Sequence, residues 1–88
     1  MPDMIDTHTL KMLIKAGSVR GVHAIDIPGG YALEFDIGMD KATLRTQRVR
    51  KEKRKFASLD KVARYLESVG VIQFEVNRGT HVHGSRPL

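Results

Sequence analysis

The chain has 88 residues, of which 41% are hydrophobic and 28% are charged, and its formal net charge is +5. A chain of this length has a thin core, because it buries only about 60–65% of the surface that its unfolded form exposes. The absence of cysteine excludes disulfides, a thiol nucleophile and a thiolate zinc site. No apolar run approaches the roughly 18 residues of a membrane-spanning helix, and the first residues lack the features of a signal peptide. We therefore expect a cytoplasmic protein without membrane contact.

The first expected element is a short helix over about residues 7–16. Asp6 or Thr7 can cap it, because a side-chain oxygen at this position accepts a hydrogen bond from a free backbone amide of the first turn. Gly17 follows the last apolar residues and supplies the left-handed conformation in which helices commonly end.

Three strands with intervening turns are expected next. Residues 19–27 are rich in β-branched side chains and end at Pro28-Gly29-Gly30, a turn that accommodates positive φ. Residues 31–37 alternate apolar and polar side chains, which is typical of a strand with one buried face. A turn over residues 38–41 leads to a third strand from residue 42 to about residue 50. These segments predict an antiparallel meander.

A second helix and a fourth strand complete the prediction. Ser58 can cap the helix, its apolar residues recur at helical spacing, and Gly70 ends it. Phe56 precedes the cap as a core residue. The fourth strand covers residues 72–76, and residues 77–88 form a flexible C-terminal tail. The fold class is α+β with the order α-β-β-β-α-β, a single domain over residues 1–76 with both helices on one face of the sheet.

The charge is unevenly distributed along the chain. Residues 1–40 carry a net charge of −3, whereas residues 41–64 carry a net charge of +8. The densest part holds six cations in eight consecutive positions: Arg48, Arg50, Lys51, Lys53, Arg54 and Lys55. Such a concentration attracts polyanions to one region of the surface.

This basic segment is the best functional signal in the sequence. As an arm between the meander and the second helix, its six cations can neutralise phosphates of a nucleic acid, DNA in the first place, and Arg45 can contact a base edge. Phe56 is the only aromatic residue close by, so stacking of unpaired bases is not favoured. A solvated surface and a docking site for an acidic protein are the alternatives.

Other candidate sites have ordinary structural explanations. His81 and His83 stand in the tail without a third ligand, so we expect no metal site. Glu34 and Asp36 share the polar face of the second strand, where they can repel polyanions or pair with a basic neighbour such as Arg45. His23 is a half-exposed strand histidine. We expect no enzymatic activity, no catalytic residue and no cofactor.

Five segments between Leu10 and Val76 resemble the small ParC-type partition-associated proteins of bacterial plasmids and related mobile elements. The segments are Lys15-Ala16-Gly17-Ser18-Val19-Arg20-Gly21, Pro28-Gly29-Gly30-Tyr31-Ala32-Leu33, Leu44-Arg45-Thr46-Gln47-Arg48, Arg54-Lys55-Phe56-Ala57-Ser58-Leu59-Asp60 with Tyr65-Leu66, and Gly70-Val71-Ile72-Gln73-Phe74-Glu75-Val76. The resemblance implies a non-enzymatic accessory protein encoded beside DNA-maintenance genes, and it supplies no catalytic or cofactor residue.

Two functional hypotheses follow. The first is a DNA-associated accessory protein of plasmid or mobile-element maintenance, acting in partition or in local gene regulation, with a partition-complex protein as a partner. The second is a homodimeric protein-interaction module whose basic arm docks an acidic partner and which pairs with another chain through the first or the fourth strand at a sheet edge.

Overall fold

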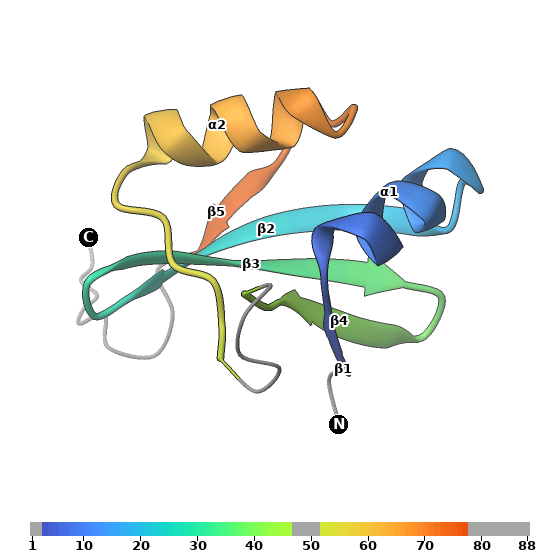
Figure 1. The fold of residues 1–88 in the computed structure, drawn as a ribbon, viewed down its shortest axis with the longest axis horizontal. Coiled ribbons are helices and arrows are strands. Elements are labelled where there is room, and N and C mark those ends of the chain that lie inside the picture. The colour runs from blue at the N-terminus through green and yellow to red at the C-terminus, as the bar shows by residue number, and fades with distance from the viewer. Residues whose placement is uncertain (1–2, 47–51, 78–88) are drawn as a thin grey trace, which may run out of the picture.

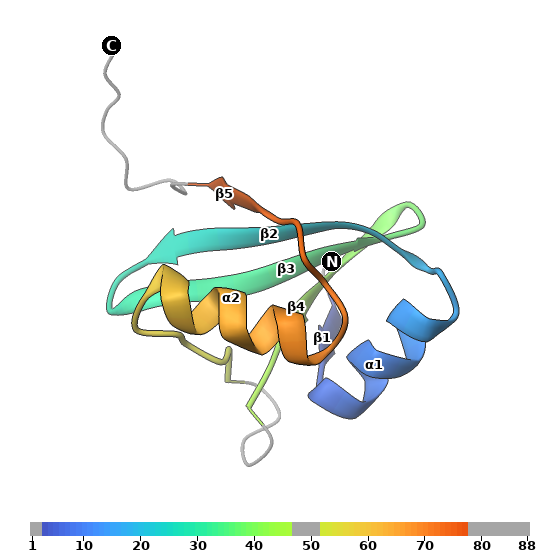
Figure 2. The same cartoon turned by 90° about the horizontal axis from the view of Figure 1, so that it is seen from above.

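The computed structural model describes residues 3–46 and 52–77. The elements are β1 (Asp3–Ile5), α1 (Thr7–Lys15), β2 (Val19–Ile27), β3 (Gly30–Ile37), β4 (Asp40–Leu44), α2 (Leu59–Ser68) and β5 (Glu75–Asn77). The strands form a mixed five-stranded sheet in the order β1-β4-β3-β2-β5, and both helices cover the same face of it (Figures 1 and 2). The predicted α+β class is confirmed, and β1 is an additional strand before the predicted order begins.

The centre of the sheet is the predicted antiparallel meander. β2 pairs with β3 and β3 pairs with β4, both antiparallel. The two outer pairs are parallel: β1 runs alongside β4, and β5 runs alongside β2. β1 consists of three residues, which is too short for an alternating pattern to reveal a strand.

The core lies between this sheet and the two helices. α1 contributes Leu10, α2 contributes Val62 and Leu66, and the strands contribute Leu33 and Phe35, all fully buried. Side-chain caps fix where each helix begins. The Asp6 carboxylate accepts a hydrogen bond from the Thr9 amide at 2.8 Å, and the Ser58 hydroxyl accepts one from the Lys61 amide at 3.3 Å.

The third and fourth strands differ in extent from the prediction. β4 ends at Leu44, and residues 47–51, which the prediction placed in this strand and in the arm, lie outside the described residues. β5 begins at Glu75 and includes Asn77. Residues 71–74 have no strand partner, and the side chain of Ile72 is 86% exposed. The predicted flexible tail lies outside the described residues from 78 onward.

In the described part of the chain, neither helix has the length and apolar character needed to cross a membrane.

Candidate nucleic-acid interface

Backbone hydrogen bonds attach residues 52–56 to the rest of the sheet at two places. On the β4 side, the Arg54 amide donates to the Leu44 carbonyl at 3.0 Å, and the Thr46 amide donates to the Glu52 carbonyl at 2.9 Å. These bonds pair Arg45 with Lys53 in an isolated antiparallel bridge. We call residues 45–55 the basic arm, and its described residues 45–46 and 52–54 lie side by side where β4 ends.

A second bridge fixes the residue that directly follows the arm against β3. Tyr31 and Phe56 exchange two backbone hydrogen bonds, each of 2.8 Å. Gly30 makes this approach possible, because its φ is +145° and a Cβ atom there would collide with the Phe56 carbonyl oxygen. The Phe56 side chain is buried, as predicted, and its ring centroid lies 5.2 Å from that of Tyr65 on α2.

Arg54 connects the arm to α2 through aromatic contacts. Its guanidinium carbon lies 5.0 Å from the Phe56 ring centroid and 4.7 Å from the Tyr65 ring centroid. A cation over two ring faces is attracted by both, so the Arg54 side chain stabilises the arm where it joins α2. The Tyr65 hydroxyl shares a hydrogen bond of 2.7 Å with the Thr7 hydroxyl of α1, and burial raises the pKa of the Tyr65 phenol.

Arg45 is tied to the start of α1. Its guanidinium lies 3.3 Å from the Asp6 carboxylate and donates to the Thr46 carbonyl at 3.0 Å, and its side chain is only 19% exposed. Hydrogen bonds from Thr9 lower the pKa of Asp6 first of all, and the Arg45 charge lowers it further. Any base edge that Arg45 contacts must compete with Asp6 for the guanidinium.

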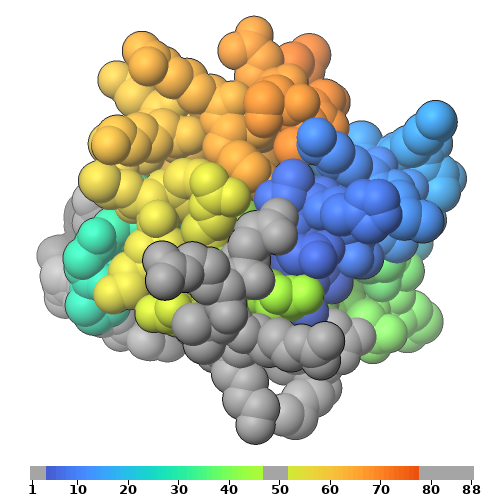
Figure 3. Space-filling model, in the orientation of Figure 1, coloured from blue at the N-terminus to red at the C-terminus, as the bar shows by residue number. Residues whose placement is uncertain are grey.

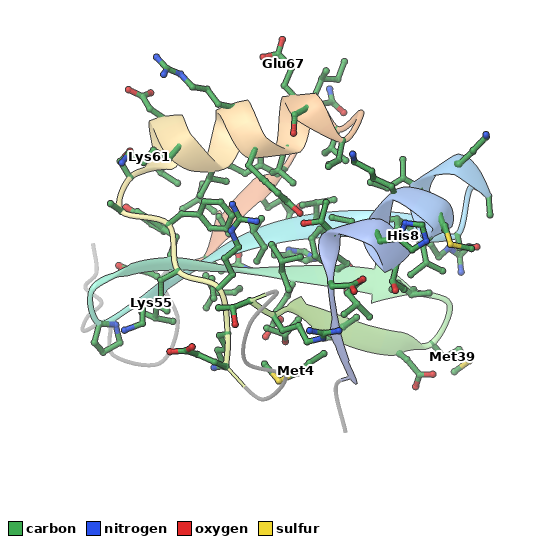
Figure 4. The ribbon with its side chains drawn as sticks, viewed as in Figure 1. Met4, His8, Met39, Lys55, Lys61 and Glu67 are labelled. Atoms are coloured by element: carbon green, nitrogen blue, oxygen red, sulfur yellow. The ribbon has the colours of Figure 1, made fainter. Side chains whose placement is uncertain are left out.

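The two described lysines of the arm have no such contacts with acidic or aromatic side chains in the described structure. Lys53 and Lys55 are exposed, and neither forms an ion pair within residues 3–46 and 52–77. Lys55 extends over the β2–β3 turn, since a Cβ atom on Gly29 would lie 3.7 Å from the Lys55 ammonium (Figure 4). Figure 3 shows residues 52–58, in yellow, at the surface between this turn and the start of α2.

The structure thus divides the predicted nucleic-acid-binding residues into three groups. Arg45 and Arg54 are engaged in contacts that support the arm, whereas Lys53 and Lys55 are free of ion pairs in the described structure. The remaining cations of the arm lie outside the described residues: Arg48, Arg50 and Lys51.

A second polar cluster lies on the face of the sheet opposite the helices. Nε2 of His23 lies 2.7 Å from the Asp36 carboxylate, and Nδ1 lies 3.3 Å from that of Glu75. The Lys41 ammonium is 3.7 Å from Asp36. The hydrogen bond from His23 holds the pKa of Asp36 below its ordinary value. This cluster joins β4, β3, β2 and β5 through side chains.

Sequence reasoning missed this cluster, because it treated His23 and the carboxylates separately. The cluster depends on how β2 and β3 are paired, because this register places Gly21 opposite Asp36 and His23 opposite Glu34. Both ring nitrogens of His23 face side chains of the protein. Within the described ranges, no three histidine, aspartate or glutamate side chains are arranged to hold a metal ion.

A comparison with protein families finds that the model of the ParC-like family matches residues 5–84. The match includes both helices, the arm and nearly all of the sheet, and it confirms the resemblance noted in the sequence. No curated protein and no solved structure matches the chain.

Proposed function

The chain belongs to the ParC-like family, and we propose that it is a small non-enzymatic, DNA-associated accessory protein of plasmid or mobile-element maintenance. It acts in partition or in regulation of neighbouring genes, and it binds DNA phosphates through the basic arm.

The observation that carries this proposal is the anchoring of the arm. Backbone hydrogen bonds join Arg54 to Leu44 and Phe56 to Tyr31, so Lys53 and Lys55 flank a residue that is fixed to the sheet on one side and precede one fixed on the other. Lys53 and Lys55 have no ion pair in the described structure, so their charges are available to phosphates. Binding that neutralises phosphates releases counterions and gives affinity without sequence preference.

Arg45 and Arg54 have a supporting role in this proposal. Arg45 pairs with Asp6, and Arg54 lies over Phe56 and Tyr65. Phosphate contacts are assigned to Lys53 and Lys55, and on sequence grounds to Arg48, Arg50 and Lys51.

The test is a titration of a fluorescent DNA duplex at several salt concentrations. Wild-type protein is expected to bind, with log affinity falling by about 0.9 per neutralised phosphate for each tenfold rise in salt. K53E/K55E is compared with K11E/K15E, which reverses two exposed lysines of α1 and so makes the same change in net charge. A much larger loss of DNA affinity in K53E/K55E than in K11E/K15E supports phosphate binding by the arm. Equal losses of affinity in the two variants, or no binding by wild type near 50 mM salt, contradict it.

A homodimeric interaction module is the second candidate, and the β5 edge favours it. β5 is the outermost strand beside β2, and exposed apolar side chains lie on and just before it: Ile72 is 86% and Val76 is 47% exposed. An unpaired edge with apolar side chains can pair with a second chain. Sedimentation equilibrium of wild type and I72S tests this. A concentration-dependent mass that I72S abolishes, together with binding of poly-glutamate but not of duplex DNA, would favour this candidate over the first.

A further inference from the structure

Cations outside the predicted arm lie on the solvent side of α2. Lys61 and Arg64 are exposed, whereas Val62 and Leu66 of the same helix are fully buried. Lys61 and Tyr65 are four residues apart, so they lie on the same side of the helix. The Tyr65 ring contacts Arg54, so this side of the helix lies next to the base of the arm, and Arg64 borders it because it follows Lys61 by three residues. We call Lys61 and Arg64 the cationic flank of α2.

The acidic residues of α2 form no ion pair with this flank in the described part of the chain. Asp60 stands four residues before Arg64 and Glu67 three residues after it, which are spacings that favour ion pairs on a helix. Nevertheless, neither carboxylate pairs with a cation in the described part of the chain. Glu67 instead lines a shallow depression on the other side of the helix with Ile72 and Phe74.

The arm and the flank are joined by packed contacts. Phe56 is buried beside Tyr65, and Arg54 lies over both rings, so the base of the arm and the middle of α2 have fixed relative positions. Figure 4 shows Lys55 and Lys61 at the same end of the molecule, one near the β2–β3 turn and the other in the first turn of α2.

The aromatic rings near this surface are already occupied. Phe56 is 6% exposed, and the Tyr65 ring carries Arg54 on its face. Stacking on unpaired bases requires accessible rings, whereas phosphate neutralisation requires only cations. The chemistry of this surface therefore suits a nucleic-acid backbone rather than exposed bases.

We infer that the cationic flank of α2 extends the phosphate-binding surface of the arm, so that Lys61 and Arg64 contact the backbone of a DNA duplex without reading its sequence. This inference rests on the proposed function. It adds a second binding element, and it specifies double-stranded DNA bound through its phosphates.

The experiment compares K61Q/R64Q with K11Q/K15Q, using full-length protein and fluorescent duplexes of two unrelated sequences. Each variant removes two exposed charges from a helix, so non-specific charge effects are matched. For K61Q/R64Q we expect the slope of log affinity against log salt to become shallower by about 1.8, which is two contacts at about 0.9 each. Affinity near 0.1 M salt should fall at least about fivefold on both sequences. K11Q/K15Q should retain the wild-type slope.

The possible failures are distinguishable. If wild type binds, K53E/K55E weakens binding and K61Q/R64Q behaves like K11Q/K15Q, the inference about α2 is overturned while the arm stands. If wild type does not bind a duplex, both the proposed function and the inference about α2 are wrong. A strong preference for one sequence, or for single-stranded DNA of the same length, would overturn the assignment to the duplex backbone.

Discussion

Nε2 of His23 lies 2.7 Å from Oδ2 of Asp36, and this contact occupies the space in which residue 21 would carry a side chain. Gly21 is in register with Asp36 across the β2–β3 pair, next to an irregularity in the register between Val19 and Gly21. A Cβ atom on Gly21 would lie 2.6 Å from Oδ2 of Asp36 and 3.4 Å from Nε2 of His23. The φ of Gly21 is not positive, so glycine is needed here for space and not for backbone conformation.

The effect of Gly21→Ala on stability should therefore differ between wild type and a variant that lacks the Asp36 carboxylate. In wild type it should lower the midpoint of thermal unfolding, because the new methyl group displaces the Asp36 carboxylate from His23. In D36A the clash is absent, and alanine should be neutral or stabilising, since glycine weakens a strand interior. Thermal unfolding of the four proteins gives the result. A similar loss in both backgrounds would mean that the Asp36 contact is not the reason for glycine at this position.

Acid unfolding should also depend on Asp36. Its pKa is lowered in the folded state, chiefly by the hydrogen bond from His23 and also by the charges of His23 and Lys41. The stability from this lowering is present above the ordinary value of 3.8 and is lost as pH falls through the lower folded pKa. D36N should thus show a weaker dependence of unfolding free energy on pH below about 4. The control is E34Q, since Glu34 lies on the same face without an ion pair in the described structure.

Local sequence patterns predicted the parts of the fold that local interactions determine. The alternation in residues 31–37, the turn glycines and the caps at Asp6 and Ser58 each involve residues close in sequence, and the structure contains all of them. The fourth strand was placed too early. Apolar alternation continues through residues 72–76, but pairing with β2 begins only at Glu75.

The contacts that define the candidate site join residues far apart in sequence. Arg45 pairs with Asp6 over a separation of 39 residues, and Thr7 bonds Tyr65 over 58. A single sequence does not show which distant residues pair in this way, so it predicted that Arg45 and Arg54 contact DNA. Among the described residues of the arm, the structure instead separates these two supporting arginines from the exposed Lys53 and Lys55. Lys61 and Arg64 could have been found from helical periodicity, because they alternate with the buried residues of α2.

Gly30 of β3 is expected to be the glycine on which the attachment of the arm depends most. Gly30→Ala would place a Cβ atom against the Phe56 carbonyl and force a residue with a side chain into φ of +145°. Strain of this kind is worth about 1–3 kcal/mol, and separating the Tyr31–Phe56 bridge adds to it. We expect the unfolding midpoint to fall by roughly 8–16 °C for a loss of about 2 kcal/mol. Gly38→Ala is the control, because that turn glycine also has positive φ but has open space around it. Equal losses would show that φ alone, and not the approach of the arm, sets the requirement.

Arg54 and Lys55 should separate stability from DNA binding. R54K keeps the charge but loses the planar group that lies over Phe56 and Tyr65, so stability should fall by about 1 kcal/mol while most DNA affinity remains. K55Q removes an exposed charge without a packing role, so stability should be unchanged and affinity should fall several-fold. Thermal unfolding and duplex titration on both variants test this pair. If R54K is fully folded and still loses as much DNA affinity as K55Q, Arg54 makes a direct phosphate contact.

The bond between Thr7 and Tyr65 joins the two helices and should be measurable in a double-mutant cycle. T7A and Y65F each break the 2.7 Å hydrogen bond, while Y65F retains the ring on which Arg54 lies. The coupling free energy should be about 0.5–1.5 kcal/mol, as for a typical intramolecular hydrogen bond.

Burial raises the pKa of Tyr65 above 10.0, and the Thr7 hydroxyl opposes this rise, so T7A should raise the pKa further. Because the folded state favours the neutral phenol, this contribution to stability is present below pH 10 and is lost as pH rises through the folded pKa. Phenolate absorbance in a Y31F background, where Tyr65 is the remaining tyrosine, reports the titration. A pKa that T7A lowers, or a coupling near zero, would show that the two hydroxyls do not interact in solution.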